Sequence, residues 1–269
     1  MFVQILGLYI GNEYISLIEM GVAEPVFESP ENIGNSLFLF SYMIVATGVM
    51  ILIIKYKKIL IRVIEIVVTF TALFLTFDFL IPVQIFYVPV SFVIALILIV
   101  WRTKRPNFYN QNLSIAFALP SIGAVIGVSL GIVPSLLLIV LISAYDFVSV
   151  FITKHMIYMA KEVAKVPTSF ALSMPHKFKK PVVFKVGKRK VKKKYHVFQL
   201  GSGDLVIPLI FSSSVLATFS LWNALLTILG SGAALILIIY FATKKRQPLP
   251  AIPLISVGTL AGFLISLVI

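Results

Sequence analysis

Two aspartates, Asp146 and Asp204, lie inside otherwise apolar stretches of the chain, ISAYDFVSVF and LGSGDLVIPL. A carboxyl group within a membrane helix destabilises it by several kcal/mol unless it is paired, hydrated or protonated. The other acidic residues lie at the ends of apolar stretches, in loops or beside a basic residue. Asp146 and Asp204 are therefore the strongest candidates for functional residues.

Two carboxyl groups brought together cannot both ionise at low cost, so they share one proton. The ionised group can accept a proton from an attacking water, and the protonated group can donate one to the developing oxyanion and then to the leaving amine. No serine, cysteine or metal ion is needed. We therefore predict aspartyl peptide hydrolysis, with Asp146 and Asp204 as the catalytic residues.

Other catalytic chemistries have little support in the composition. The chain has no cysteine, which excludes a thiolate nucleophile or a thiolate metal ligand. Its three histidines, His155, His176 and His196, lie in or beside one basic segment, where solvated side chains are commoner than ligands. We expect neither a metal site nor a cofactor.

The elements that position the aspartates are predicted to be membrane helices. Of the 269 residues, 59% are hydrophobic and 12% charged, whereas about a quarter of a soluble domain is charged. This composition predicts an all-α membrane protein. Eight apolar segments are long enough to cross a bilayer: 36–54, 59–80, 83–101, 112–131, 134–153, 198–220, 222–243 and 250–269. A ninth segment, 2–21, is interrupted by polar residues, so we expect nine transmembrane helices, or eight without it.

The basic residues indicate the orientation of these helices. All 23 lysines and arginines fall on one side of the predicted topology, and the opposite loops hold Glu24, Glu28, Glu31 and Asp78. The positive-inside rule makes the basic side cytoplasmic and places the C-terminus outside. The net charge of +13 therefore indicates contact with anionic headgroups rather than with nucleic acid.

The chain then divides into three parts: transmembrane helices in 1–153, a basic cytoplasmic loop in 154–197, and further transmembrane helices in 198–269. Asp146 precedes Lys154 by about 12 Å of helix, and Asp204 follows Lys194 by about 15 Å if that stretch is helical. The two carboxyl groups should therefore reach a similar depth, on the cytoplasmic side of the membrane centre.

Glycines and prolines flank the predicted pair. Gly201 and Gly203 weaken the start of a helix and expose backbone, which is tolerated at membrane depth only against protein or water. We expect a wet cavity there. Prolines at the start of the last span, around Pro250-Ala251-Ile252, indicate either an irregular segment beside the aspartates or a simple helix start.

Two further patterns concern packing and the basic loop. Small residues repeat at four-residue spacing at 123–131 and 258–266, which allows close helix approach. We favour packing within the chain, and a homo-oligomer is the alternative. In the loop, 181–186 and 191–197 are rich in β-branched, aromatic and lysine residues around Gly187-Lys188, which predicts either a mobile segment that can form a hairpin or a solvated basic loop without regular structure. The strand edge of the hairpin could pair with an unwound substrate.

Three motifs together resemble those of the presenilin and signal peptide peptidase family of GxGD aspartyl proteases. They are Tyr145-Asp146, Gly201-Ser202-Gly203-Asp204 and Pro250-Ala251-Ile252, with Ile252 where the family has leucine. The resemblance covers nearly the whole chain and, with Thr153-Lys154-His155-Met156, is closest to the archaeal branch.

This resemblance implies a presenilin-like bundle, catalytic Asp146 and Asp204, and substrates that are transmembrane helices of other proteins. It also implies that Tyr145, Gly201, Gly203 and the segment 250–252 shape the site. A cytoplasmic loop between the two aspartates corresponds to the orientation of presenilins, and the short chain suggests that it acts alone.

Two other functions are alternatives to a presenilin-like protease. Prepilin peptidases also have a GxGD motif in a membrane, but they lack a PAL segment opening the last helix. Multi-pass transporters and ion channels also use buried carboxylates and broken helices. They often contain internal repeats, and this sequence has no convincing duplication.

Overall fold

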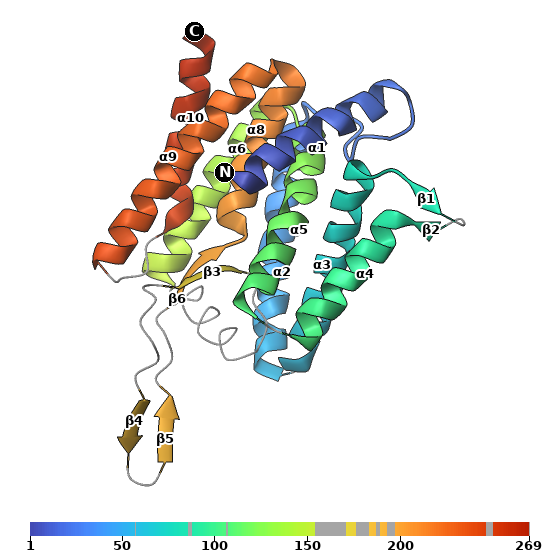
Figure 1. Ribbon diagram of the computed structural model, residues 1–269. Coiled ribbons are helices and arrows are strands. Elements are labelled where there is room, and N and C mark those ends of the chain that lie inside the picture. The colour runs from blue at the N-terminus through green and yellow to red at the C-terminus, as the bar shows by residue number, and fades with distance from the viewer. Residues whose placement is uncertain are drawn as a thin grey trace.

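The computed structural model describes residues 1–56, 58–85, 88–105, 107–153, 171–175, 183–186, 189–192, 197–245 and 250–268. Within these ranges the chain forms nine α-helices, most of them side by side in one bundle (Figure 1). They are α1 (Phe2–Glu19), α2 (Ile33–Tyr56), α3 (Lys58–Leu80), α4 (Val90–Lys104), α5 (Phe108–Val128), α6 (Ile132–Phe147), α8 (Gly203–Thr218), α9 (Leu221–Lys245) and α10 (Ala251–Val268). The predicted all-α class is confirmed.

The bundle is apolar on its outside as well as its inside. In the described residues, six helices are long and apolar enough to cross a membrane, and α8 is a shorter apolar helix. The span of α2 is only 6% buried, and large side chains such as Phe38, Tyr42 and Val45 are exposed on it. A surface of this kind is stable in lipid. The protein is a multi-pass membrane protein.

Two predicted spans begin later than the sequence suggested. The span predicted at 83–101 opens with a short hairpin, β1 (Gln84–Ile85) paired with β2 (Val88–Pro89), and α4 starts only after Pro89. Proline has no amide donor but has a helical φ, so it commonly lies at a helix start. The span predicted at 198–220 opens with a strand, and its helix starts at Gly203.

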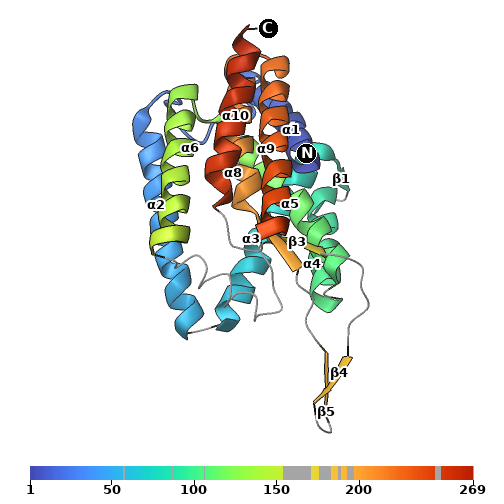
Figure 2. The same cartoon turned by 90° about the vertical axis from the view of Figure 1, so that its left-hand side faces the viewer.

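The glycine repeats pack helices within the chain. A Cβ atom at Gly123 would meet Leu209 of α8, and one at Gly127 would meet the backbone of Ile210. At the other repeat, Gly258 and Gly262 lie against Gly230 of α9, so α9 and α10 run side by side (Figure 2). The predicted packing within the chain is therefore confirmed for both repeats.

Among the described residues, four strands lie between the two halves of the bundle in the sequence. β4 (Val183–Val186) pairs with β5 (Arg189–Lys192) in an antiparallel hairpin that projects from one end of the bundle (Figure 1). The hairpin is one of the two alternatives predicted for this loop, and its second strand begins earlier than expected. β3 (Ala171–Pro175) pairs with β6 (Val197–Gly201), which was not predicted. The three histidines and most of the basic loop lie outside the described residues.

Candidate active site

The predicted site lies where α6 ends and where α8 and α10 begin. One apolar cluster joins the three helices through Ile142 of α6, Ile210 of α8 and Ile252 of α10. The strand β6 ends at Gly201, directly before α8, so the β3–β6 pair lies at this same end of the bundle (Figure 1). Helices from both halves of the chain therefore converge on one place.

Asp146 occupies the last turn of α6 and is only 3% exposed. Its Oδ2 accepts a hydrogen bond of 3.2 Å from the backbone N–H of Ile252, and the amide of Ala251 faces the same carboxyl group. The first amides of a helix have no partner within that helix, and they favour a negative charge. Asp146 thus caps α10 from another helix, which brings the 250–252 segment to the predicted catalytic aspartate.

The chain just after Asp146 is not an ordinary α-helix. Val148–Ile152 form a π-helix (η1), and the hydroxyl of Ser149 donates to the Asp146 carbonyl at 3.0 Å. Single turns of π-helix are rare and are frequent at functional sites. The apolar sequence VSVFI contains no signal for this irregularity, so it was missed in the sequence.

Asp204 lies in the first turn of α8 and is half-buried. Its Oδ2 accepts a hydrogen bond of 3.1 Å from the backbone N–H of Gly201. A side chain that reaches back to an amide just before its helix stabilises the helix start, as in a capping box. A Cβ atom at Gly201 would lie 3.3 Å from Asp204 Oδ2, whereas one at Gly203 would meet only Ile207, at 3.8 Å. The nearby carboxyl group therefore explains why residue 201 is a glycine, but it does not explain the glycine at 203.

The structure brings the two aspartates together. The carboxyl group of Asp204 lies within electrostatic reach of Asp146, although the two come from helices more than 50 residues apart in the sequence. Each carboxyl group accepts a hydrogen bond from a backbone N–H of a different neighbouring segment. These bonds fix the orientation of each carboxyl group. Two oriented carboxyl groups at one site can exchange a single proton.

The remaining predicted site residue, Tyr145, faces a different helix. Its ring packs edge-on against Phe40 of α2, with ring centroids 6.2 Å apart. Aromatic pairs of this geometry stabilise packing beyond the area that they bury. Tyr145 thus ties the aspartate helix α6 to the peripheral helix α2.

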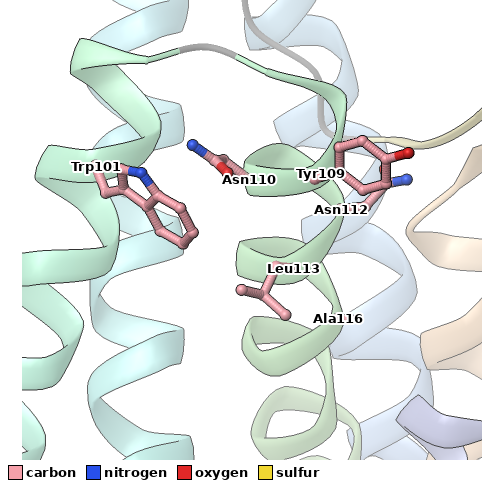
Figure 3. A pocket seen from close by; sticks show the side chains of 6 residues that line it. All are labelled: Trp101, Tyr109, Asn110, Asn112, Leu113 and Ala116. Carbon is pink, nitrogen blue, oxygen red and sulfur yellow. The ribbon is translucent and has the colours of Figure 1, made fainter.

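A hollow elsewhere in the molecule lacks the chemistry of this site. It lies between the end of α4 and the start of α5, has a volume of about 370 Å³, and its labelled lining residues carry no acidic group (Figure 3). The lining residues are Trp101, Tyr109, Asn110, Asn112, Leu113 and Ala116. Within the described ranges, the acidic and histidine side chains form no group suited to a metal ion.

Comparisons with known proteins give the family and the fold of the chain. A family model described as signal-peptide peptidase, presenilin aspartyl protease matches residues 2–269. No curated protein matches the chain. Two solved structures of a presenilin family intramembrane aspartate protease are similar in fold. The C222 form has a TM-score of 0.64 and 20% identity, and covers 98% of this chain and 92% of that one. The P2 form has a TM-score of 0.67 and 22% identity, and covers 99% and 96%.

Proposed function

Because the chain belongs to the signal-peptide peptidase and presenilin aspartyl protease family, we propose that Asp146 and Asp204 are the two catalytic groups of its peptide hydrolysis. The protein is an intramembrane aspartic endopeptidase, and transmembrane segments of other proteins are its substrates. The observation that carries the proposal is the convergence of two carboxyl groups, each held by a backbone amide, at the junction of α6, α8 and α10.

The pair performs hydrolysis with one shared proton. The ionised carboxyl group removes a proton from a water molecule as its oxygen attacks the peptide carbonyl carbon. The protonated carboxyl group gives its proton to the carbonyl oxygen, which forms a neutral tetrahedral intermediate. When the C–N bond breaks, the protonated carboxyl group gives its proton to the leaving nitrogen, and the ionised one accepts a proton from a hydroxyl of the intermediate, so the pair is again singly protonated. We assign these roles to the pair as a unit, because interacting carboxyl groups titrate together.

The hydrogen bonds from backbone N–H groups orient the two carboxyl groups. The N–H groups of Ile252 and Gly201 belong to backbone segments fixed by α10 and by the β3–β6 pair. Groups held before the reaction need no reorganisation during it. Gly201 and the 250–252 segment therefore act as site-shaping residues, and the half-buried Asp204 leaves the pair accessible from one side.

We infer that the site lies toward the cytoplasmic face of the membrane. The helix ends that carry cations, those of α2, α4 and α9, lie at the same end of the bundle as β6 and the hairpin (Figure 1). The connection between α1 and α2, whose sequence includes Glu24, Glu28 and Glu31, lies toward the other end. The positive-inside rule makes the cationic end cytoplasmic, where anionic headgroups can bind the basic loop. Substrates are then cleaved near the cytoplasmic end of their membrane helix.

Reconstitution separates this function from transport by buried carboxylates. The purified protein is placed in liposomes together with a model single-span helix, and the products are identified by mass spectrometry. We expect discrete fragments cut within the membrane segment, and no proton or ion flux beyond that of liposomes without protein. Flux without fragments would indicate a transporter or channel instead.

A further inference from the structure

A pair of serines joins the helix of Asp146 to the helix that caps it. The hydroxyl oxygens of Ser143 on α6 and Ser256 on α10 lie 2.7 Å apart. Ser256 is 5% exposed and Ser143 is half-buried, so this contact is shielded from competing solvent. It connects positions 113 residues apart in the sequence.

The two serines are each one helical turn from a residue of the site. Ser143 precedes Asp146 by three residues, and Ser256 follows Ile252 by four. Their contact lies one turn away from the bond between the Ile252 amide and Asp146 Oδ2, which joins the same two helices. Two contacts on adjacent turns fix both the distance and the register between the helices, whereas one contact alone leaves them free to slide or rotate.

The two serine hydroxyls make three hydrogen-bond contacts but have only two protons to donate. Ser143 also lies 2.7 Å from the Ile139 carbonyl, and Ser256 lies 2.8 Å from the Ile252 carbonyl. Each hydroxyl has one proton, so two protons serve three contacts. When Ser143 donates to Ser256, Ser256 still donates to the Ile252 carbonyl. A chain of hydrogen bonds then runs from Ser143 through Ser256 to the carbonyl of Ile252, the residue whose amide donates to Asp146.

We propose that Ser143 and Ser256 are positioning residues for Asp146, which set the register of α10 so that the Ile252 amide meets the catalytic carboxyl group. The inference rests on the proposed function of Asp146 and extends it to a second layer of residues that do not touch the substrate. Loss of either hydroxyl leaves α10 attached through its apolar contacts but loosens its first turn against Asp146.

The chain offers a matched control on the same helix. Ser135 of α6 makes a buried hydrogen bond of 3.1 Å to Ser214 of α8 and also contacts a backbone carbonyl, that of Ile132. It lies about 16 Å along the helix from Asp146. S135A therefore removes the same kind of bond between helices without changing the surroundings of the site.

The test measures kcat, KM and the thermal unfolding midpoint in liposomes for S143A, S256A, S143A/S256A, S143T and S135A. We expect kcat to fall roughly tenfold in S143A and in S256A, because small misplacements of a catalytic group have large effects on rate. KM should change less than about twofold. The double variant should be no slower than the slower single variant, because the two hydroxyls act as one contact. S143T, which keeps the hydroxyl, should recover most of the activity.

S135A should lower the unfolding midpoint about as much as S143A while kcat stays near that of the wild type. The inference is overturned if S135A loses as much kcat as S143A, if the losses of the single variants multiply in the double variant, or if S143T is as slow as S143A. Wild-type kcat in both alanine variants also overturns it. None of these results bears on the dyad itself, whose own test is the activity of D146N and D204N.

Discussion

The backbone N–H of Ile252 donates a hydrogen bond of 3.2 Å to Oδ2 of Asp146. It joins the first turn of the last helix to the last turn of α6, where Asp146 is buried. A motif about 100 residues from the aspartate in the sequence is thus part of its immediate surroundings. The contact gives a direct way to perturb the carboxyl group without changing it.

Replacing Ile252 by proline removes this amide donor while leaving the backbone suited to a helix start. We expect kcat to fall about 100-fold, the lower end of the range seen when a single oriented donor is lost from an enzyme site. I252V is the control, because it keeps the amide and shortens the buried side chain. Steady-state cleavage of a model membrane helix measures both. Equal rates in I252P and I252V would show that the amide has no role.

Pro250 lies just before the first residue of α10. Its ring restricts φ and keeps the chain from continuing the helix backwards. We expect P250L to lower the cleavage rate at least tenfold, with little change in the unfolding midpoint, because leucine allows the segment to leave Asp146. Thermal unfolding monitored by circular dichroism provides the stability comparison. A loss of activity no larger than the loss of folded protein would contradict a role in the site.

Cleavage should require a singly protonated pair of carboxyl groups. At low pH both groups carry a proton and no base is available, whereas at high pH both are ionised and no acid is available. The rate should therefore fall on both sides of an optimum, and the two limits belong to the pair rather than to either residue. A profile of kcat against pH in liposomes checks this. A rate that stays constant from acid to strongly alkaline pH would exclude the mechanism.

The hairpin β4–β5 and the β3–β6 pair lie at the end of the bundle where the aspartates are found (Figure 1). A helical substrate is already hydrogen-bonded to itself, so it must unwind before its peptide bond can reach the carboxyl groups. A strand edge could replace the lost bonds. We expect V183P/K185P to slow cleavage of a helical substrate several-fold while an already extended peptide is cut at the wild-type rate. Equal effects on the two substrates, or no effect on either, would exclude a role of the hairpin in unwinding.

The parts of the structure that were predictable are those with a strong local signal. Carboxyl groups in an apolar stretch are rare enough to make Asp146 and Asp204 candidate site residues from hydropathy alone. The β-branched residues around Gly187-Lys188 indicated the hairpin. Most helices were likewise evident, because about 20 apolar residues in a row leave few alternatives in a membrane.

The parts that were missed depend on partners distant in sequence. β3 was not expected, because ALSMP has no clear alternation and becomes a strand only by pairing with β6. The π-helix after Asp146 has no sequence signature. Serines are common in membrane helices, so the contact between Ser143 and Ser256 could not be chosen without the rotation of both helices.

The most direct measurement is the cleavage rate of D146N, D204N and the double variant on a model transmembrane helix in liposomes. Asparagine keeps the size of the side chain but cannot exchange the proton. Because the two groups act as a unit, each single variant should lose nearly all activity, and the double variant should lose no more. Circular dichroism should show all three inserted and folded. Substantial cleavage by either folded single variant would contradict the two-carboxyl mechanism.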